Sequence, residues 1–217
     1  MRIPLTSYGA RELVLFGGAS LAGIVASAVF AWYLTPLFAV VLALVLNFFR
    51  DPSRMPPEEP GLVVSPADGR VVEVAEVDEP QYLRAMSHKV AIFMSPLNVH
   101  VNRAPCGGQV EAVVHSPGGY RNAARPEASS RNESVTMTIR VAERDTRLLV
   151  RQVAGAIARR IVCAAAAADR LERGQRYGMI KFGSRAEVYV PVASGFQVAV
   201  QLGQRVRAGE TVLGRFR

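Results

Sequence analysis

The segment Leu62–Val72, with the sequence LVVSPADGRVV, decides the fold. Three apolar residues lead into a turn that contains Ser, Pro, Asp and Gly, and a β-branched run follows the turn. Pro and Asp-Gly favour tight turns and β-branched residues favour strands, so the segment predicts a strand, a turn and a second strand. Apolar and polar residues continue to alternate as far as Val77, which is typical of a strand with one buried face.

A second segment near the C-terminus, Val198–Gly214, repeats this order of strand, turn and strand. It resembles the pattern of lipoyl and biotinyl domains, which are small flattened β-barrels. We therefore expect a mainly β fold, a barrel-sandwich (lipoyl-like) hybrid core, with an N-terminal apolar helical hairpin. Further runs with strand character lie at residues 90–94, 109–115, 134–141 and 148–153.

The stretch Leu13–Phe49 contains no charged residue. It is too long for one membrane span of about 20 residues and short for two. Thr35-Pro36 interrupts it, so a tight apolar hairpin fits. Arginines flank the stretch on both sides, which favours a hairpin with both ends in the cytoplasm. The same stretch also fits a buried core hairpin in a soluble protein.

A proline-rich segment follows the apolar stretch. Proline lacks a backbone donor and favours extended chain, so residues 51–61 are expected to connect rather than to pack. The sequence thus predicts three parts: a membrane-anchoring hairpin at 1–50, a linker at 51–61 and a β-rich domain at 62–217.

The formal net charge is +8. The arginines are scattered and no nucleic-acid-binding signature is present, so we expect an anionic membrane surface as the partner and no nucleic acid. The sequence is also compatible with a homo-oligomer. Cys106 and Cys163 lack the spacing of a metal site, and we expect both to be reduced and structural.

One peptide bond carries a chemical possibility of its own, the bond between Gly183 and Ser184. A serine hydroxyl can attack the carbonyl that precedes it, and glycine offers no Cβ to obstruct that attack. The resulting ester can be eliminated, and hydrolysis of the remaining residue gives a pyruvoyl group. A Gly-Ser pair between strands is also ordinary turn chemistry, so the pair alone leaves both readings open.

Four segments together resemble the short bacterial phosphatidylserine decarboxylases in order and spacing. The resemblance implies a membrane-associated, self-processing enzyme that converts phosphatidylserine to phosphatidylethanolamine and CO2 in phospholipid biosynthesis. It implies a precursor cut between 183 and 184 into β and α chains, a pyruvoyl cofactor derived from Ser184, and neither pyridoxal phosphate nor metal. It places the catalytic domain on the cytoplasmic face of the inner membrane. The segments are Phe48–Pro52, Val64–Gly69, Phe93–Arg103 and Phe182–Arg185.

The resemblance also suggests residues for proton transfer. His100 is the expected base, because an imidazole can take and give protons at neutral pH. Asp68 is the expected partner that orients or stabilises this histidine. Each residue also has a plainer interpretation, His100 as a strand-end histidine that binds the backbone and Asp68 as a turn former.

Longer members of the family carry His-x-x-His where this chain has His100-Val101-Asn102-Arg103. The second histidine is thus replaced by Arg103, whose planar fork suits a carboxylate or a phosphate. Arg103 and His115, which precedes a glycine-containing loop, are candidates for substrate binding. An ordinary surface charge is the alternative for Arg103.

Three other functions remain open at this point. The same chemistry could act on another serine phospholipid, such as archaetidylserine. A non-enzymatic, membrane-anchored, lipoyl-like carrier or adaptor is a second alternative, although neither turn carries the lysine that such a carrier modifies. A sugar-transport phosphocarrier with His100 as the phosphorylated residue is a third.

Overall fold

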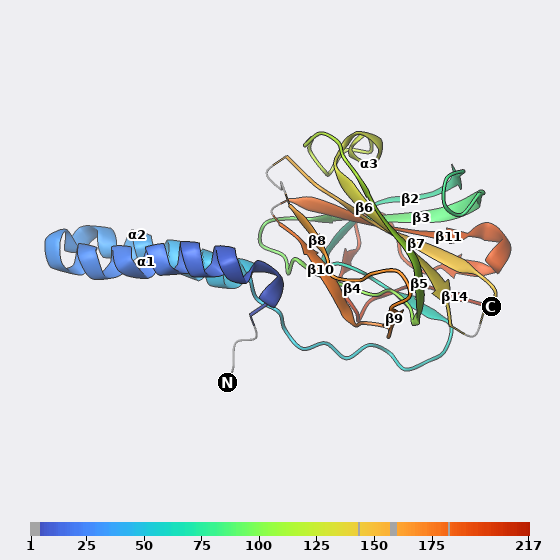
Figure 1. Cartoon of the computed structure of the whole chain (residues 1–217), viewed down its shortest axis with the longest axis horizontal. Helices are drawn as coiled ribbons and strands as arrows, with labels where there is room; N and C mark the ends of the chain where they lie inside the picture. Colours follow the sequence, from blue (N-terminus) through green and yellow to red (C-terminus); the bar gives the residue numbers. More distant parts are fainter. Residues whose placement is uncertain (1–4, 143, 157–159, 182) are drawn as a thin grey trace. The chain divides into compact units, whose positions relative to one another are not determined.

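The computed structural model describes residues 5–142, 144–156, 160–181 and 183–217. The chain divides into two compact units, one that ends at Ser53 and one that runs from Arg54 to Arg217. Helices make up the first unit and strands dominate the second (Figure 1). The predicted combination of an apolar helical hairpin and a mainly β fold is confirmed.

The first unit is a hairpin of two packed helices. Helix α1, Ala10–Phe30, and helix α2, Thr35–Phe48, are joined by the short 3-10 helix η2, Trp32–Leu34. A Cβ at Gly23 would lie 2.4 Å from a ring atom of Phe38, so the glycine lets this ring pack directly on the backbone of α1. The break predicted at Thr35-Pro36 is where α2 begins, and proline is tolerated in the first turn of a helix.

A backbone hydrogen bond joins the two chain segments at the end of the hairpin opposite to its turn. A further 3-10 helix, η1, occupies Ser7–Gly9, and the N–H of Thr6 donates to the carbonyl of Phe49 at 3.0 Å. Near the turn of the hairpin, the hydroxyls of Ser27 and Thr35 lie 3.0 Å apart. These contacts satisfy polar groups within the hairpin itself.

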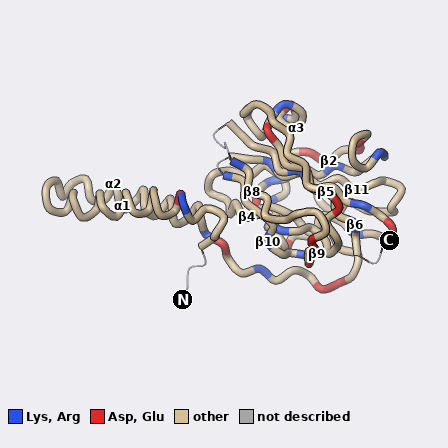
Figure 2. Tube along the Cα trace, in the orientation of Figure 1, with Lys and Arg blue, Asp and Glu red and all other residues tan. Residues whose placement is uncertain are grey.

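The outer surface of the hairpin is apolar. Large hydrophobic side chains are exposed along both helices, and Trp32 and Tyr33 are exposed at the turn between them. The segment Ser7–Phe30 is long and apolar enough to cross a membrane, and Trp32–Phe48 is a shorter apolar stretch. Figure 2 shows the charged residues that are described in this unit gathered at one end of the hairpin.

Within its described residues, the second unit contains three antiparallel sheets. The largest has eight strands in the order β13-β2-β3-β11-β7-β6-β5-β9, and two three-stranded sheets have the orders β1-β14-β12 and β4-β10-β8. Two short helices, α3 at Ala128–Arg131 and η3 at Val192–Ser194, lie in the connections. The strands are β1 Leu62–Val64, β2 Gly69–Glu79, β3 Ala85–Met94, β4 Val101–Arg103, β5 Gly108–Ser116, β6 Ser134–Val141, β7 Arg147–Val153, β8 Ile161–Cys163, β9 Arg170–Leu171, β10 Arg176–Ile180, β11 Ser184–Pro191, β12 Phe196–Val198, β13 Arg205–Val206 and β14 Val212–Phe216.

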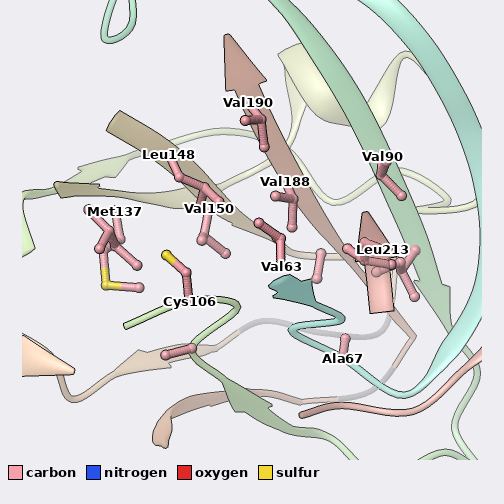
Figure 3. Close-up of a cluster of buried hydrophobic side chains, with 14 of the residues drawn as sticks. Val63, Ala67, Val90, Cys106, Met137, Leu148, Val150, Val188, Val190 and Leu213 are labelled. Carbon is pink, nitrogen blue, oxygen red and sulfur yellow. The ribbon is translucent and has the colours of Figure 1, made fainter. Parts of the chain in front are cut away.

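One face of the large sheet forms the hydrophobic core. Alternate residues of β11, namely Ala186, Val188 and Val190, belong to the buried apolar cluster, as expected from the period of two in a strand. Figure 3 shows side chains of this cluster, among them Val63 and Leu213 from the first and last strands, gathered together. The two strands predicted in Leu62–Val72 are present as β1 and β2. They lie in different sheets, and β1 pairs with the C-terminal strand β14.

The opposite face of β11 carries charges that are also buried. Arg185 and Glu187 are both fully buried and their side chains form an ion pair of 2.6 Å between Nε and Oε1. Arg185 also pairs with Glu73 of β2, and Lys89 of β3 contacts the carboxylates of Glu73 at 3.0 Å and Glu187 at 3.5 Å. The hydroxyl of Ser129, in α3, donates to Glu187 at 2.8 Å.

This network changes the protonation of Glu187. Burial alone would raise the pKa of Glu187, but the positive charges of Lys89 and Arg185 outweigh burial and hold this pKa below its ordinary value of 4.5. A carboxyl with a lowered folded-state pKa stabilises the fold above its unfolded pKa. That stabilisation is lost as the pH falls through the folded-state value.

We expect Glu187→Gln to lower the free energy of unfolding at neutral pH by about 3–5 kcal/mol, because it leaves buried cations without their carboxylate. The difference from wild type should shrink as the pH falls from 4.5 through the lower folded-state pKa of Glu187, where the folded carboxyl takes up its proton. Denaturant unfolding at several pH values measures both effects. The control is Glu76→Gln on β2, whose side chain is 59% exposed. Equal losses for the two variants would contradict the prediction.

Candidate active site

The register of the large sheet brings the termini of several strands together at one end of the sheet. Ser184, the first residue of β11, lies opposite Met94, the last residue of β3. On the other side of β11, Arg185 lies opposite Val153, the last residue of β7. Strand β2 begins at Gly69, directly after Asp68, at the same end of the sheet. The candidate residues Asp68 and Ser184 are thereby brought to one end of the sheet.

Ser184 is fully buried in the intact chain. Its hydroxyl donates to the sulfur of Met94 at 3.3 Å, and a thioether is a weak acceptor that holds a hydroxyl only loosely. The preceding Gly183 has φ +58°, a left-handed conformation that favours glycine. Phe182, the first residue of the motif, lies outside the described residues.

The carbonyl of Gly183 rests against the backbone of Gly155. A Cβ added at Gly155 would lie 1.6 Å from the oxygen and 2.7 Å from the carbon of the Gly183 carbonyl. No side chain can occupy that space, so Gly155 shapes a recess for the carbonyl of the Gly183-Ser184 bond. The methyl group of Ala123, from the loop between β5 and β6, lies 3.3 Å from the same point.

Asn132 holds this recess in place. Its Nδ2 donates to the carbonyl of Ala154 at 2.7 Å and to that of Arg121 at 2.8 Å, and its Oδ1 accepts from the Arg121 N–H at 2.9 Å. The carbonyl of Glu133 accepts from the Ala154 N–H at 2.9 Å. The backbone next to Gly155 is therefore bound both to the start of β6 and to the preceding loop.

His100 is fully buried and directly precedes β4. Its Nδ1 lies 2.9 Å from the carbonyl oxygen of Asn98. Because a carbonyl only accepts, Nδ1 carries the proton in the neutral ring, and Nε2 is the nitrogen that can take one up. The carbonyl of His100 accepts from the N–H of Ile180 at 3.4 Å, which ties the histidine to the end of β10, just before Gly183.

Asp68 is buried and anchors the turn between β1 and β2. Its Oδ1 accepts from the N–H of Ala208 at 2.7 Å, and its Oδ2 pairs with Arg54 at 2.9 Å. Arg54 also pairs with Glu210 at 3.0 Å. Both contacts join Asp68 to segments distant in sequence, and Arg54 balances its charge. The partnership of Asp68 with His100 stays a prediction.

The two candidates for substrate binding lie in different surroundings. Arg103 is buried and its Nη1 donates to the carbonyl of Gly174 at 3.0 Å, so it fastens β4 to a neighbouring turn. His115 is on β5, three strands away from β11 in the sheet order. Its side chain is 57% exposed, and its Nε2 lies 3.0 Å from a carboxylate oxygen of Glu133.

A pair of buried amides lies in the interior beside Met94. Gln152 Nε2 donates to Asn102 Oδ1 at 2.9 Å, and Asn102 Nδ2 donates to the carbonyl of Pro66 at 3.3 Å. Asn102 Nδ2 also approaches the sulfur of Met94 at 3.9 Å. No sequence pattern singled out these amides or Gly155 as site residues, although an isolated glycine next to a strand is a signal of close backbone approach.

Neither cysteine has the properties of a reactive thiol. Both are free, and burial raises the pKa of Cys106 to about 12 against the opposing charge of Arg173. Within the described ranges, no group of three or more His, Cys, Asp and Glu side chains is arranged to hold a metal ion.

Comparison with known proteins identifies the family. A family model described as phosphatidylserine decarboxylase matches residues 41–214. Proteins named phosphatidylserine decarboxylase proenzyme are similar to the chain. The one from Rhodopirellula baltica is 41% identical over 99% of this chain and 89% of its own length. The one from Symbiobacterium thermophilum is 44% identical over 99% and 97%, and the one from Salinibacter ruber is 49% identical over 80% and 76%. The chain therefore belongs to the phosphatidylserine decarboxylase family and is a carboxy-lyase, which decides against the carrier and phosphocarrier alternatives.

Proposed function

We propose that the chain is a proenzyme that cuts itself between Gly183 and Ser184 and then decarboxylates phosphatidylserine to phosphatidylethanolamine. The observation that carries this proposal is the recess at Gly155, which receives the Gly183 carbonyl beside a buried serine hydroxyl. An ordinary surface turn needs neither the burial nor the close approach.

The cut begins at the hydroxyl of Ser184. Its oxygen attacks the carbonyl carbon of Gly183, the C–N bond breaks and the freed nitrogen takes up the hydroxyl proton, which leaves an ester. A base then removes the Cα proton of Ser184, and the carboxylate of Gly183 leaves with the C–O electron pair. Water hydrolyses the remaining enamine, ammonia is released, and the residue becomes a pyruvoyl group.

The residues present fit such a group. Gly155 leaves space for the carbonyl oxygen of Gly183 where a Cβ would collide, and Ser184 is shielded from solvent. When formed, the pyruvoyl group supplies an electrophilic carbonyl that accepts the electron pair released with CO2. His100, through Nε2, is suited to remove the Cα proton during the cut and to return a proton to the substrate carbon after CO2 leaves.

The two chains made by the cut would stay together. Strand β11 begins the smaller chain and pairs with β3 and β7, which both belong to the larger chain. The ion pair between Arg185 and Glu73 joins the same two chains next to the new end.

The apolar hairpin would anchor the enzyme to the membrane. Its exposed surface is hydrophobic and its charged residues lie at one end. The basic residues that flank the hairpin in the sequence favour the cytoplasmic face for the catalytic domain. A phospholipid substrate is then reached without leaving the bilayer surface.

We predict that the purified protein consists of two chains, residues 1–183 and 184–217, with the smaller one blocked at its N-terminus. Ser184→Ala should remain one uncut chain without decarboxylase activity, whereas Ser130→Ala, at an exposed serine, should behave as wild type. Intact mass spectrometry and CO2 release measure the two properties. Full activity in an uncut chain would refute the proposal.

His100→Ala should slow the cut, decarboxylation or both by roughly 10²–10⁴, the usual contribution of a general acid or base. If elimination is the impaired step, the ester accumulates and hydroxylamine cleaves the chain at Gly183. His88→Ala on β3 is the control. Normal cleavage and normal turnover in His100→Ala would remove this residue from the mechanism. Asp68→Asn, measured in the same assays, tests whether Asp68 acts with His100.

Gly155→Ala should prevent the first step, because the added methyl group displaces the Gly183 carbonyl. Such a variant should stay uncut and should form no ester that hydroxylamine can cleave, in contrast to His100→Ala. The control is Gly107→Ala, where an added Cβ would meet only atoms at 3.8 Å or more. Thermal unfolding of Gly155→Ala in the Ser184→Ala background separates lost cleavage from lost folding. A normally cut Gly155→Ala chain would show that the recess is dispensable.

A further inference from the structure

The loops next to Ser184 form one end of the large sheet, which we call the Ser184 end. Two connections leave the sheet there, the β3–β4 turn at residues 95–100 and the β5–β6 connection at residues 117–133. Paired residues of six strands mark this end as one row. The row consists of Ser116, Ser134, Val153, Arg185, Phe93 and Arg70.

A lipid substrate restricts what the Ser184 end can face. The acyl chains of a phospholipid stay in the bilayer, and only a few bonds join its serine group to its phosphate. Ser184 is fully buried, so the shortest route for that serine group starts from a bilayer that lies against the Ser184 end. The apolar hairpin keeps the chain at the membrane, but it does not decide which face of the second unit meets the lipid.

The β3–β4 turn carries exposed apolar residues at this end. Leu97 is 66% exposed and lies three residues after Met94, which is the residue opposite Ser184. The preceding Pro96 is exposed as well. A large apolar side chain is stabilised when a lipid surface removes it from water.

Asn98 holds this turn in a fixed shape. The N–H and the hydroxyl of Ser95 both donate to Asn98 Oδ1 at 2.8 Å, and the Asn98 N–H donates to the carbonyl of Ser95 at 3.0 Å. The carbonyl of Asn98 also lies 2.9 Å from Nδ1 of His100. The same residue therefore fixes both the exposed Leu97 and the proposed base, so a bilayer that covers Leu97 lies next to the site of reaction.

The β5–β6 connection adds positive charge to the Ser184 end. Arg121, Arg125 and Arg131 are exposed, and no carboxylate among the described residues forms an ion pair with any of them. Within residues 117–133, all of which are described, Glu127 is the one exposed carboxylate. Bilayers that contain phosphatidylserine are negatively charged, so this excess of positive charge favours contact with them.

We propose that the Ser184 end is the face of the second unit that docks on the bilayer, with Leu97 inserted among the lipids beside the site of reaction. The partner is a phospholipid surface that contains phosphatidylserine. This inference rests on the proposed function, because the lipid substrate supplies the reason for the contact. It adds the orientation of the second unit on the membrane.

A fluorescence measurement tests the insertion without turnover. Trp32, the only tryptophan of the chain, is changed to Phe in the uncut Ser184→Ala chain, and Leu97→Trp is added. In vesicles of phosphatidylserine and a phosphatidylcholine with brominated acyl chains, this tryptophan should lose most of its emission, because bromine quenches a tryptophan that it contacts. The control is Met86→Trp, at a residue that is 50% exposed on β3 and about 27 Å from Met94 along the strand. Its emission should be unaffected.

Turnover gives a second readout. Leu97→Asp should lower CO2 release from phosphatidylserine vesicles about 10-fold, because the apolar contact is lost and anionic headgroups repel the carboxylate. The same variant should match wild type on a short-chain phosphatidylserine below its critical micelle concentration, and its cut at Gly183 should be complete. Leu97→Met and Met86→Asp should match wild type on both substrates.

Several results would overturn the inference. Equal quenching at positions 97 and 86, or quenching at neither, would mean that the second unit does not dock by the Ser184 end. An equal loss for Leu97→Asp on vesicles and on the soluble substrate would mean that Leu97 acts inside the site and not on the membrane. If wild type releases no CO2 from phosphatidylserine, the proposed function fails, and the quenching then decides on docking alone.

Discussion

The pairing of strand β11 on both sides, with β3 and with β7, is the constraint on which the rest of the structure depends. A shift of one residue in either ladder would move Ser184 from the core face to the opposite face. It would also exchange the buried apolar side chains of β11 for Arg185 and Glu187. The apolar core on one face and the ion network on the other therefore fix the same register, and with it the position of the reactive serine.

Contacts between segments distant in sequence build the candidate active site at the start of β11. Gly155 follows β7 and lies against the carbonyl before β11, and Asn132 binds the backbone beside Gly155. Each contact joins segments that are distant in sequence, so the site forms only when the whole sheet has formed. Self-cleavage at Gly183 would for this reason report on correct folding, since an unfolded chain lacks the recess.

Local patterns carried the prediction of the fold. Alternation after Gly69 predicted β2, and the uncharged stretch interrupted at Thr35-Pro36 predicted the helical pair, because periodicity and turn chemistry are properties of neighbouring residues. The chemistry of the Gly183-Ser184 bond was readable for the same reason. Gly155 was not found, because its importance arises from a contact with a different strand. The partnership of Asp68 with His100 stays a prediction. The contacts of Asp68 with Arg54 and Ala208 could not be predicted, because they come from segments that no local pattern connects.

The complete burial of Ser184 has a consequence for the kind of chain end that the protein can tolerate. Plain hydrolysis of the Gly183-Ser184 bond would leave an α-ammonium group, with a pKa of about 7.7–8.0, at a position without solvent. Burying an unpaired cation is costly, and the fully buried Arg185 lies directly beside it. A pyruvoyl end carries no charge. Burial of the new terminus therefore disfavours the charged end that hydrolysis would leave and is compatible with the neutral pyruvoyl end. The cost of removing the chain end from water thus favours elimination over hydrolysis of the same bond.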